Sequence, residues 1–344
     1  MSDDFFGPGG GCTTIRGETI CPSNITLVFF DGQVRNITDC TVDTCSLLIA
    51  NWGYLPNIGG NVFFVLVFAA FMIANIVLGL WKRTWGVFVG MTLGTLFEML
   101  GYIGRVMAHY QPFDFNPFLI YIIFLTIGPA LLSAAIYLCL ARIIVVYGKE
   151  NARFKPRVYS IIFMVSDFIA LVLQGAGGGI AATAAGNDAQ TAQSGINIMI
   201  AGLAWQVISL TTFALAAADF AWCVKRRGFS APDLLYLRQS TKFRNFLYAL
   251  SVASVAVYVR SIYRVAELSQ GFDGYIANQE IPYMIFEPVM ITIACVCLTV
   301  WHPSIVFGDV WKTVSNETRL RKKTANLELG SMGEGRFKSS NSSG

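Results

Sequence analysis

The sequence predicts an all-α polytopic membrane protein: a bundle of seven transmembrane helices with the N-terminus outside and the C-terminus in the cytoplasm. Three observations predict it. Of the 344 residues, 54% are hydrophobic and 13% are charged, whereas about 25% of the residues of a typical soluble domain are charged. Seven stretches reach the roughly 20 apolar residues that a spanning helix needs. Basic residues fall almost entirely on one side of these stretches. This composition excludes a disordered chain and a nucleic-acid-binding protein, and it disfavours a soluble enzyme.

The seven expected helices are separated by short polar connectors. They are too long to be strands of an outer-membrane barrel, which span with about 10 alternating residues. In chain order they are Ile58–Trp81, Trp85–Ala108, Pro117–Tyr147, Val158–Ala185, Ile196–Cys223, Phe246–Glu267 and Tyr283–Trp301. We therefore expect an N-terminal tail over residues 1–57, a helical domain over residues 58–301, and a disordered cytoplasmic tail over residues 302–344.

The orientation follows from the distribution of lysine and arginine. Nineteen of the 25 basic residues lie in the connectors after the first, third and fifth helices and in the C-terminal tail. The other side holds only Arg16 and Arg35, both in the N-terminal tail, and the remaining four basic residues lie in or at the ends of helices. Because cytoplasmic loops carry the excess of basic residues, the N-terminus is predicted outside.

The N-terminal tail has the composition of an exported segment. Four of the eight cysteines fall there, namely Cys12, Cys21, Cys40 and Cys45. They flank two Asn-X-Thr sequons, at Asn24 and Asn36. An even number of cysteines beside sequons is typical of an oxidised, glycosylated segment. Three disulfide pairings are possible and the sequence does not choose among them. Chance sequons with free thiols are the other interpretation.

The C-terminal tail ends in a stretch rich in Gly, Ser and Asn, which is typical of disorder. Before it, Arg319–Lys323 forms a basic run. This run either contacts anionic lipid or lies in a solvated tail.

Several charged or strongly polar residues fall inside the predicted helices. They are Glu98, Arg105, Asp167, Gln174, Arg260, Arg264, Glu267 and Glu287. A charge at the bilayer centre costs about 2.5–3.5 kcal/mol, so each needs a partner or a purpose. The seven charged residues sum to −1, which predicts pairing between helices. Two interpretations remain: the pairs lock helices together, or they form a polar site for the head group of an amphiphile or for a proton.

The positions of these residues along the helices predict where they gather. Glu98 lies in the middle of the second helix, with Arg105 seven residues further along on the same face. Gly101 and Gly104 lie between these two residues in the sequence and would let the backbone of another helix approach closely. Most of the other charges fall in the outer half of the sixth and seventh helices. Pro288 directly follows Glu287 and is expected to disrupt the last helix locally.

The run Gln174–Gly179 resembles a nucleotide-binding loop only superficially, since no strand precedes it and no lysine follows. Close helix packing, a broken helix, or carbonyls lining a cavity are the alternatives. The sequence also has no Walker motif and no nucleophile elbow. Its nine lysines all lie outside the apolar segments, so none is placed to form a retinal Schiff base within a helix. Its two histidines are too few for a multi-histidine zinc site. An enzyme is not expected, and neither a cofactor nor a metal ion is expected.

Several of these motifs resemble those of the fungal lipid-translocating exporter family, the 7-aminocholesterol-resistance-like proteins. The motifs are Glu98-x-x-Gly-Tyr-x-x-Arg105, Gln174-x-x-Gly-Gly-Gly179, the run from Arg260 through Tyr263-Arg264, Glu267, Gly271, Gly274 and Glu280 to Glu287, and Trp301-His302-Pro303. The resemblance covers about residues 50–310. It implies a fungal seven-helix protein of the plasma membrane, linked to movement of sphingoid long-chain bases, to resistance against sterol analogues and drugs, and to porphyrin handling.

Two classes of function are compatible with these features. In the first, the protein is an exporter of amphiphilic lipids such as sphingoid long-chain bases or sterol-like molecules, and Glu98, Glu267 and Glu287 bind a cationic head group while the tail stays in lipid. In the second, it is a seven-helix receptor or sensor of the G-protein-coupled type, which shares the outside N-terminus and the basic cytoplasmic connectors. Membrane lipids are the expected partners, and nucleic acid is not one.

We predict that Asn24 and Asn36 carry glycans, because the topology places both sequons outside. Enzymatic deglycosylation should lower the apparent mass of the wild type but not that of the double variant Asn24→Gln, Asn36→Gln. A mass shift that persists in the double variant would mean that another segment is exported, or that the topology is inverted.

Overall fold

The computed structural model describes residues 54–82, 84–148, 153, 155–184, 189–227, 239–269 and 276–307, together with four short strands before them. The fold class predicted from the sequence is confirmed: seven helical segments are long and apolar enough to cross a membrane. The long helices are α1 (Ile58–Lys82), α2 (Trp85–Tyr110), α3 (Phe115–Tyr147), α4 (Pro156–Ala184), α5 (Ala189–Arg227) and α7 (Thr241–Leu268). The last span is divided into α8 (Glu280–Met284), a π-helical turn η5 (Ile285–Val289), α9 (Met290–Val300) and α10 (Pro303–Phe307).

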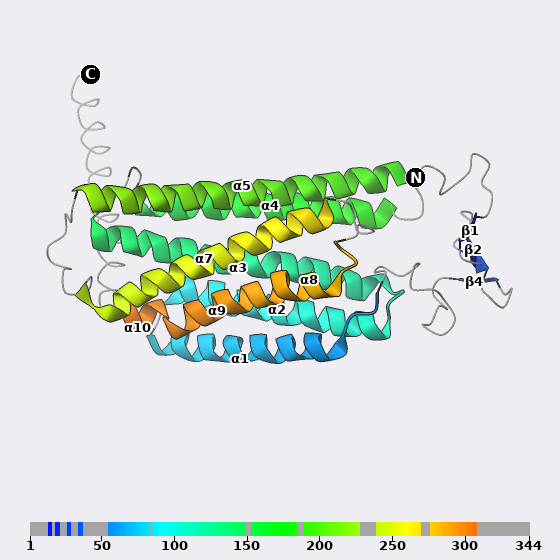
Figure 1. Cartoon of the computed structure of the whole chain (residues 1–344), viewed down its shortest axis with the longest axis horizontal. Helices are drawn as coiled ribbons and strands as arrows, with labels where there is room; N and C mark the ends of the chain where they lie inside the picture. Colours follow the sequence, from blue (N-terminus) through cyan, green and yellow to red (C-terminus); the bar gives the residue numbers. More distant parts are fainter. Residues whose placement is uncertain are drawn as a thin grey trace, which may run out of the picture.

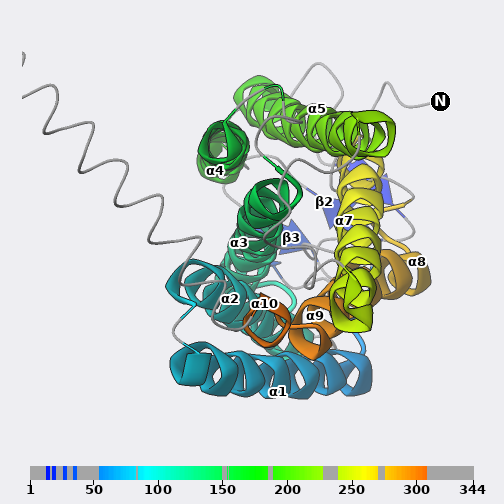
Figure 2. The same ribbon diagram turned by 90° about the vertical axis from the view of Figure 1, so that its left-hand side faces the viewer.

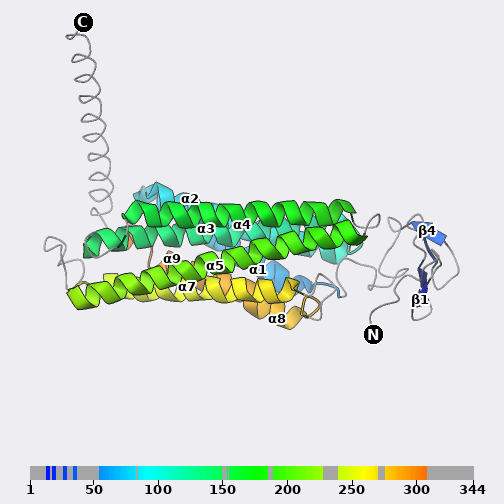
Figure 3. The same cartoon turned by 90° about the horizontal axis from the view of Figure 1, so that it is seen from above.

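The long helices lie roughly parallel to one another (Figure 1). Viewed end-on, they form a ring in which each packs on the next, and α9 closes it by packing against α7 and α1 (Figure 2). α4 and α5 run side by side along the bundle (Figure 3). The junction between α5 and α7 is less extensive than that between α4 and α5.

Successive spans run in opposite directions, which defines two ends of the bundle. We call the end where α1 begins the Ile58 end, and the end where α1 finishes the Lys82 end. α2 and α7 finish at the Ile58 end, while α3 and α8 begin there. The orientation predicted from the basic residues places the Ile58 end outside.

Glycines on α2 allow it to lie close against α3, as the sequence predicts. A Cβ added at Gly104 would lie 2.9 Å from the backbone nitrogen of Tyr121 and 3.2 Å from the carbonyl oxygen of Pro117. One at Gly101 would meet the side chain of Leu125. Any larger residue would therefore push the two backbones apart.

Only one glycine of the α4 tract is needed for packing against α5. α4 is continuous through it, so the broken-helix alternative is wrong and close packing is the one observed. A Cβ at Gly177 would collide with the backbone of α5 at Met199 and Gly195. One at Gly175 or Gly179 would meet no atom within 4 Å. Only Gly177 is therefore needed for the contact.

Several helix boundaries differ from the predicted ones because polar turns continue beyond the apolar core. α5 begins at Ala189 rather than Ile196 and ends at Arg227 rather than Cys223. α7 begins at Thr241 rather than Phe246. With 39 residues, α5 is about 58 Å long at 1.5 Å per residue, far more than the roughly 30 Å of a bilayer core. The backbone hydrogen bonds of a helix do not require apolar side chains, so hydropathy marks the membrane rather than the helix end.

Helical structure also continues past Trp301, the predicted end of the helical domain. α10 occupies Pro303–Phe307, and Phe307 is buried. Its ring packs edge-on against Phe243 and Phe246 of α7. This apolar contact fixes the first residues of the segment that the sequence assigns to the tail.

The tail before α1 contains four strands that the sequence analysis did not anticipate. They are β1 (Thr13–Ile15), β2 (Glu18–Ile20), β3 (Thr26–Val28) and β4 (Val34–Asn36), paired antiparallel in that order. Cys12, Cys21, Cys40, Cys45 and Asn24 lie outside the described residues, and Asn36 is described only as the last residue of β4. Residues 308–344 also lie outside them. The disulfides, the glycans and the disordered tail therefore stay predictions.

We predict opposite effects for two substitutions within the glycine tract. Gly177→Ala should destabilise the α4–α5 contact by about 1–3 kcal/mol, the usual cost of overpacking. Gly179→Ala should leave stability unchanged or raise it by up to about 1 kcal/mol, since alanine favours a helix. Thermal unfolding of the two purified variants measures the difference. Equal melting temperatures would contradict the close approach at Gly177.

Candidate functional site

Six charged side chains gather inside the bundle toward the Ile58 end, as the sequence predicts. We call them the polar cluster: Glu98, Arg105, Arg260, Arg264, Glu267 and Glu287. Each is at most 4% exposed. They come from α2, α7 and η5, and their three positive and three negative charges balance.

Arg260 of α7 joins three elements. Its Nη2 donates to the Glu287 carboxylate of η5 and to the backbone carbonyl of Leu125 on α3. That carbonyl is free because Pro129, four residues later, lies inside α3 and has no N–H to donate to it. The proline therefore supplies an acceptor in the membrane interior, where water cannot.

Glu287 and Glu267 both lie beside Arg264. The Nη1 of Arg264 donates to Glu267 Oε2 at 2.7 Å, and its Nε lies 3.9 Å from Glu287 Oε2. Pro288 disrupts the last span as predicted, and the π-helical turn η5 carries Glu287 there. The four residues form one chain of opposite charges, Glu267–Arg264–Glu287–Arg260, across two helices.

Arg105 occupies a different setting, surrounded by tyrosines. Its guanidinium lies 3.9 Å from the ring centre of Tyr283 and 5.1 Å from that of Tyr121. Its Nη2 donates to the Tyr54 hydroxyl at 2.8 Å, and its Nε donates to Asn61 Oδ1 at 3.1 Å. Such cation–π contacts gain strength when water is excluded. The Tyr121 hydroxyl also accepts from Arg264, so the aromatic group links the two parts of the cluster.

The short segment before α1 covers the cluster at the Ile58 end. The Asn57 N–H donates to Glu280 Oε1 at 2.6 Å, which ties this segment to α8. The Pro56 carbonyl accepts from His109 Nδ1 of α2 at 2.7 Å. Burial raises the pKa of the Tyr54 phenol above its ordinary value, and the nearby charge of Arg105 only partly opposes this shift. Tyr54 therefore stays neutral and accepts the arginine's hydrogen bond.

Glu98 differs from the other carboxylates because nothing among the described residues hydrogen-bonds it. It is fully buried, and neither carboxylate oxygen has a donor. Its charged neighbours are Arg260, Glu287 and Arg264. Gly128 of α3 makes room for it, since a Cβ there would lie 3.0 Å from Glu98 Oε1. An unpaired buried polar group is costly, and Glu98 is the carboxylate of the cluster in which both oxygens are left to accept hydrogen bonds.

Two of the residues singled out in the sequence lie apart from the cluster. Gln174 of α4 donates to Gln206 of α5, and this pair crosses the α4–α5 contact. Asp167, also on α4, accepts hydrogen bonds from Tyr137 and Ser209. Both α4 residues are buried, but the structure does not bring them to the six charges.

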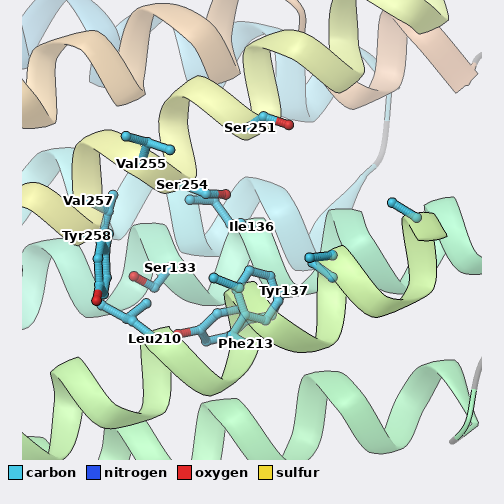
Figure 4. A pocket seen from close by; sticks show the side chains of 14 residues that line it. Ser133, Ile136, Tyr137, Leu210, Phe213, Ser251, Ser254, Val255, Val257 and Tyr258 are labelled. Atoms are coloured by element: carbon cyan, nitrogen blue, oxygen red, sulfur yellow. The ribbon is translucent and has the colours of Figure 1, made fainter.

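A cavity of about 350 Å³ lies between α3, α5 and α7 (Figure 4). Tyr137, Phe213 and Tyr258 line it, with small side chains such as Ser133 and Ser254. Along α7 its lining ends at Tyr258, two residues before Arg260, and extends from there toward the Lys82 end. The cavity and the cluster are thus neighbours along α7.

Sequence reasoning identified the charged residues but missed their neutral partners. Tyr54, Asn57 and Asn61 were assigned to a tail or to an apolar helix, and Leu125 contributes only its backbone. The one available signal for the Leu125 carbonyl was Pro129 within an apolar run. Among the residues that the structure describes, no three His, Cys, Asp or Glu side chains form a possible metal site.

Comparison with known proteins finds a matching protein family and several relatives. Residues 91–309 match the family model described as RTA1 like protein. The chain is 33% identical over 283 residues to the sphingoid long-chain base transporter RSB1 of Saccharomyces cerevisiae, covering 74% of each chain. It is 28% identical to protein RTM1 of that yeast, over 68% of this chain and 72% of the other. Protoporphyrin uptake protein 1 of the same species is 30% identical, over 66% and 71%. No solved structure matches the chain.

We predict that the Arg260–Glu287 pair is strongly coupled in stability. Arg260→Met should cost about 3–5 kcal/mol because it leaves a buried carboxylate without its closest partner. Adding Glu287→Met should recover much of that loss, since the uncompensated charge is removed. Denaturation of the wild type, of Arg260→Met, of Glu287→Met and of the double variant gives the double-mutant cycle.

The exposed pair between Arg153 and Asp219 provides the control. Arg153→Met should leave stability unchanged, because an exposed ion pair contributes little. If Arg260→Met is as stable as Arg153→Met, the buried pair does not hold the bundle together.

Proposed function

The chain belongs to the RTA1-like protein family, and we propose that it translocates amphiphilic lipids such as sphingoid long-chain bases across the plasma membrane. Resistance to toxic lipids or drugs would follow from this export. The observation that carries the proposal is the similarity over 74% of both chains to a yeast protein named as a sphingoid long-chain base transporter. A second relative is named for protoporphyrin uptake, another largely apolar molecule with charged groups.

The polar cluster suits the head group of such a substrate. A long-chain base carries a cationic amine on an apolar chain. Arg260 and Arg264 form ion pairs with Glu287 and Glu267, whereas Arg105 contacts tyrosines and Asn61. Among the described residues no arginine hydrogen-bonds Glu98, so an ammonium ion would give this carboxylate a partner of opposite charge.

Glu98 is the residue that would receive the amine. Glu267 and Glu287 already accept hydrogen bonds from Arg264 and Arg260, whereas both oxygens of Glu98 lack a donor among the described residues. An ammonium group supplies three donors and one positive charge. The tail would stay in lipid or in the neighbouring cavity.

The other interpretation, a seven-helix receptor, has less support. None of the three relatives named above is named as a receptor, and two are named for transport or uptake. Movement without a nucleotide-binding motif would be facilitated or ion-coupled. The protein would work without chemistry on its substrate, with its N-terminus outside.

We predict that Glu98→Gln slows transport strongly while the protein still folds. The amide has nearly the same shape but lacks the charge that an ammonium needs. The transport rate is measured with a labelled C18 long-chain base and vesicles that contain the purified protein as their only protein. The rate for Glu98→Gln should fall about tenfold or more, as expected for the loss of an interaction of about 1.4 kcal/mol or more.

Asp219→Asn is the matched control, since it neutralises a more exposed carboxylate paired with Arg153. It should transport at the wild-type rate. If wild-type vesicles move no labelled base, the translocator proposal is wrong. If Glu98→Gln moves it as fast as the wild type, Glu98 does not bind the head group.

A further inference from the structure

Asp167 is a second buried carboxylate, in the other half of the bundle. It lies 11 residues after the start of α4 at the Lys82 end and is 4% exposed. The Tyr137 hydroxyl of α3 donates to one oxygen at 2.8 Å, and the Ser209 hydroxyl of α5 donates to the other at 3.3 Å. Both donors are neutral. No ion pair to Asp167 occurs within the part of the chain that the structure describes.

The cavity between α3, α5 and α7 shares a wall with this carboxylate. Tyr137 both lines the cavity and donates to Asp167. Leu210, next to Ser209, also lines it. Figure 4 shows Tyr137 and Phe213 close together at one side of the cavity, with ring centres 4.6 Å apart. The cavity therefore has one polar, aromatic wall with a negative charge behind it.

The remaining lining favours a hydrocarbon chain. Four alanines of α5, together with Val255 and Val257 of α7, face the cavity. Its volume of about 350 Å³ is at the lower end of the roughly 300–1,000 Å³ of ligand pockets. That size suits a single chain rather than a lipid with two chains.

A cation completes this arrangement. A buried carboxylate held only by neutral donors lacks the countercharge that such groups normally have. An ammonium ion at the Tyr137 hydroxyl would supply it, and the faces of Tyr137 and Phe213 attract a cation as well. In the polar cluster, by contrast, Glu267 and Glu287 already have arginine partners.

We propose that the cavity and the Tyr137–Asp167 pair form a second, inner binding site for a single-chain amphiphile with a cationic head group. The chain fills the cavity and the amine lies at Tyr137, with Asp167 behind it. This inference rests on the proposed function and adds an intermediate position to it. Gly128, which adjoins Glu98, is nine residues from Tyr137 on α3, which is about 14 Å along a helix. The substrate thus moves between two acidic sites that α3 connects.

Direct binding to the full-length protein in lipid nanodiscs tests the inner site. The probes are a labelled C18 long-chain base and the C18 alcohol that lacks the amine. Asp167→Asn should bind the base about tenfold more weakly and the alcohol as the wild type does. Tyr137→Phe, which keeps the ring and removes the hydroxyl, should weaken base binding in the same direction.

Filling the cavity gives an independent test that leaves Asp167 intact. Ala214 of α5 lines the cavity, so Ala214→Phe should weaken binding of both probes. Ala201 is exposed on the same helix and does not line the cavity, so Ala201→Phe is the matched control and should bind both normally. Melting temperatures of all variants identify any that fail to fold.

The outcomes separate the two proposals. Wild-type binding of the base by folded Asp167→Asn and by folded Ala214→Phe would overturn the inner site, even if vesicles with the wild type transport the base. If Asp167→Asn does not fold, wild-type binding by Ala214→Phe overturns the site by itself. If the wild type neither binds nor moves the base, the translocator proposal itself fails. A loss confined to the base in Asp167→Asn, with a loss of both probes in Ala214→Phe, supports the inner site.

Discussion

The guanidinium of Arg260 joins α7 to α3 and to η5, and the rest of the polar cluster depends on this junction. A positive charge in a dry interior must find both countercharge and hydrogen-bond acceptors within the protein. Arg260 finds a carboxylate on η5 and a carbonyl on α3. Each acceptor depends on a proline: Pro129 frees the Leu125 carbonyl, and Pro288 lies in the π-helical turn that carries Glu287. Two irregular helices are thus fixed to α7 at one point, and the chain of charges through Arg264 extends from it.

This arrangement divides the buried acids into two kinds. Glu267 and Glu287 are neutralised by arginines and stabilise the fold. Glu98 and Asp167 have no such partner among the described residues, and each lies where small side chains or a cavity leave room. In a membrane bundle an unneutralised acid is costly. We therefore expect these two residues, rather than the paired ones, to meet a cationic substrate.

Sequence reasoning predicted the seven spans because apolar length alone sets them. It also predicted the interruption at Pro288 and the gathering of charges in one half, since helix direction fixes the depth of Glu98, Arg105 and Arg260. It could not predict which arginine meets which glutamate, because that depends on how helices rotate and which side-chain rotamers fit. The tyrosines around Arg105 were invisible for the same reason. Asp167 was grouped with the other charges, whereas α4 places it apart from them, behind the cavity-lining Tyr137.

In the mechanism proposed above, carboxylates inside the bundle recognise a cationic head group. The most direct measurement is the melting temperature of the purified wild-type protein with a C18 long-chain base or with the C18 alcohol. A ligand at 100 times its dissociation constant stabilises the folded state by about 2.7 kcal/mol. We expect the base to raise the melting temperature clearly and the alcohol to raise it far less. Equal shifts would show that only the apolar chain is recognised, and would contradict recognition of the head group by these carboxylates.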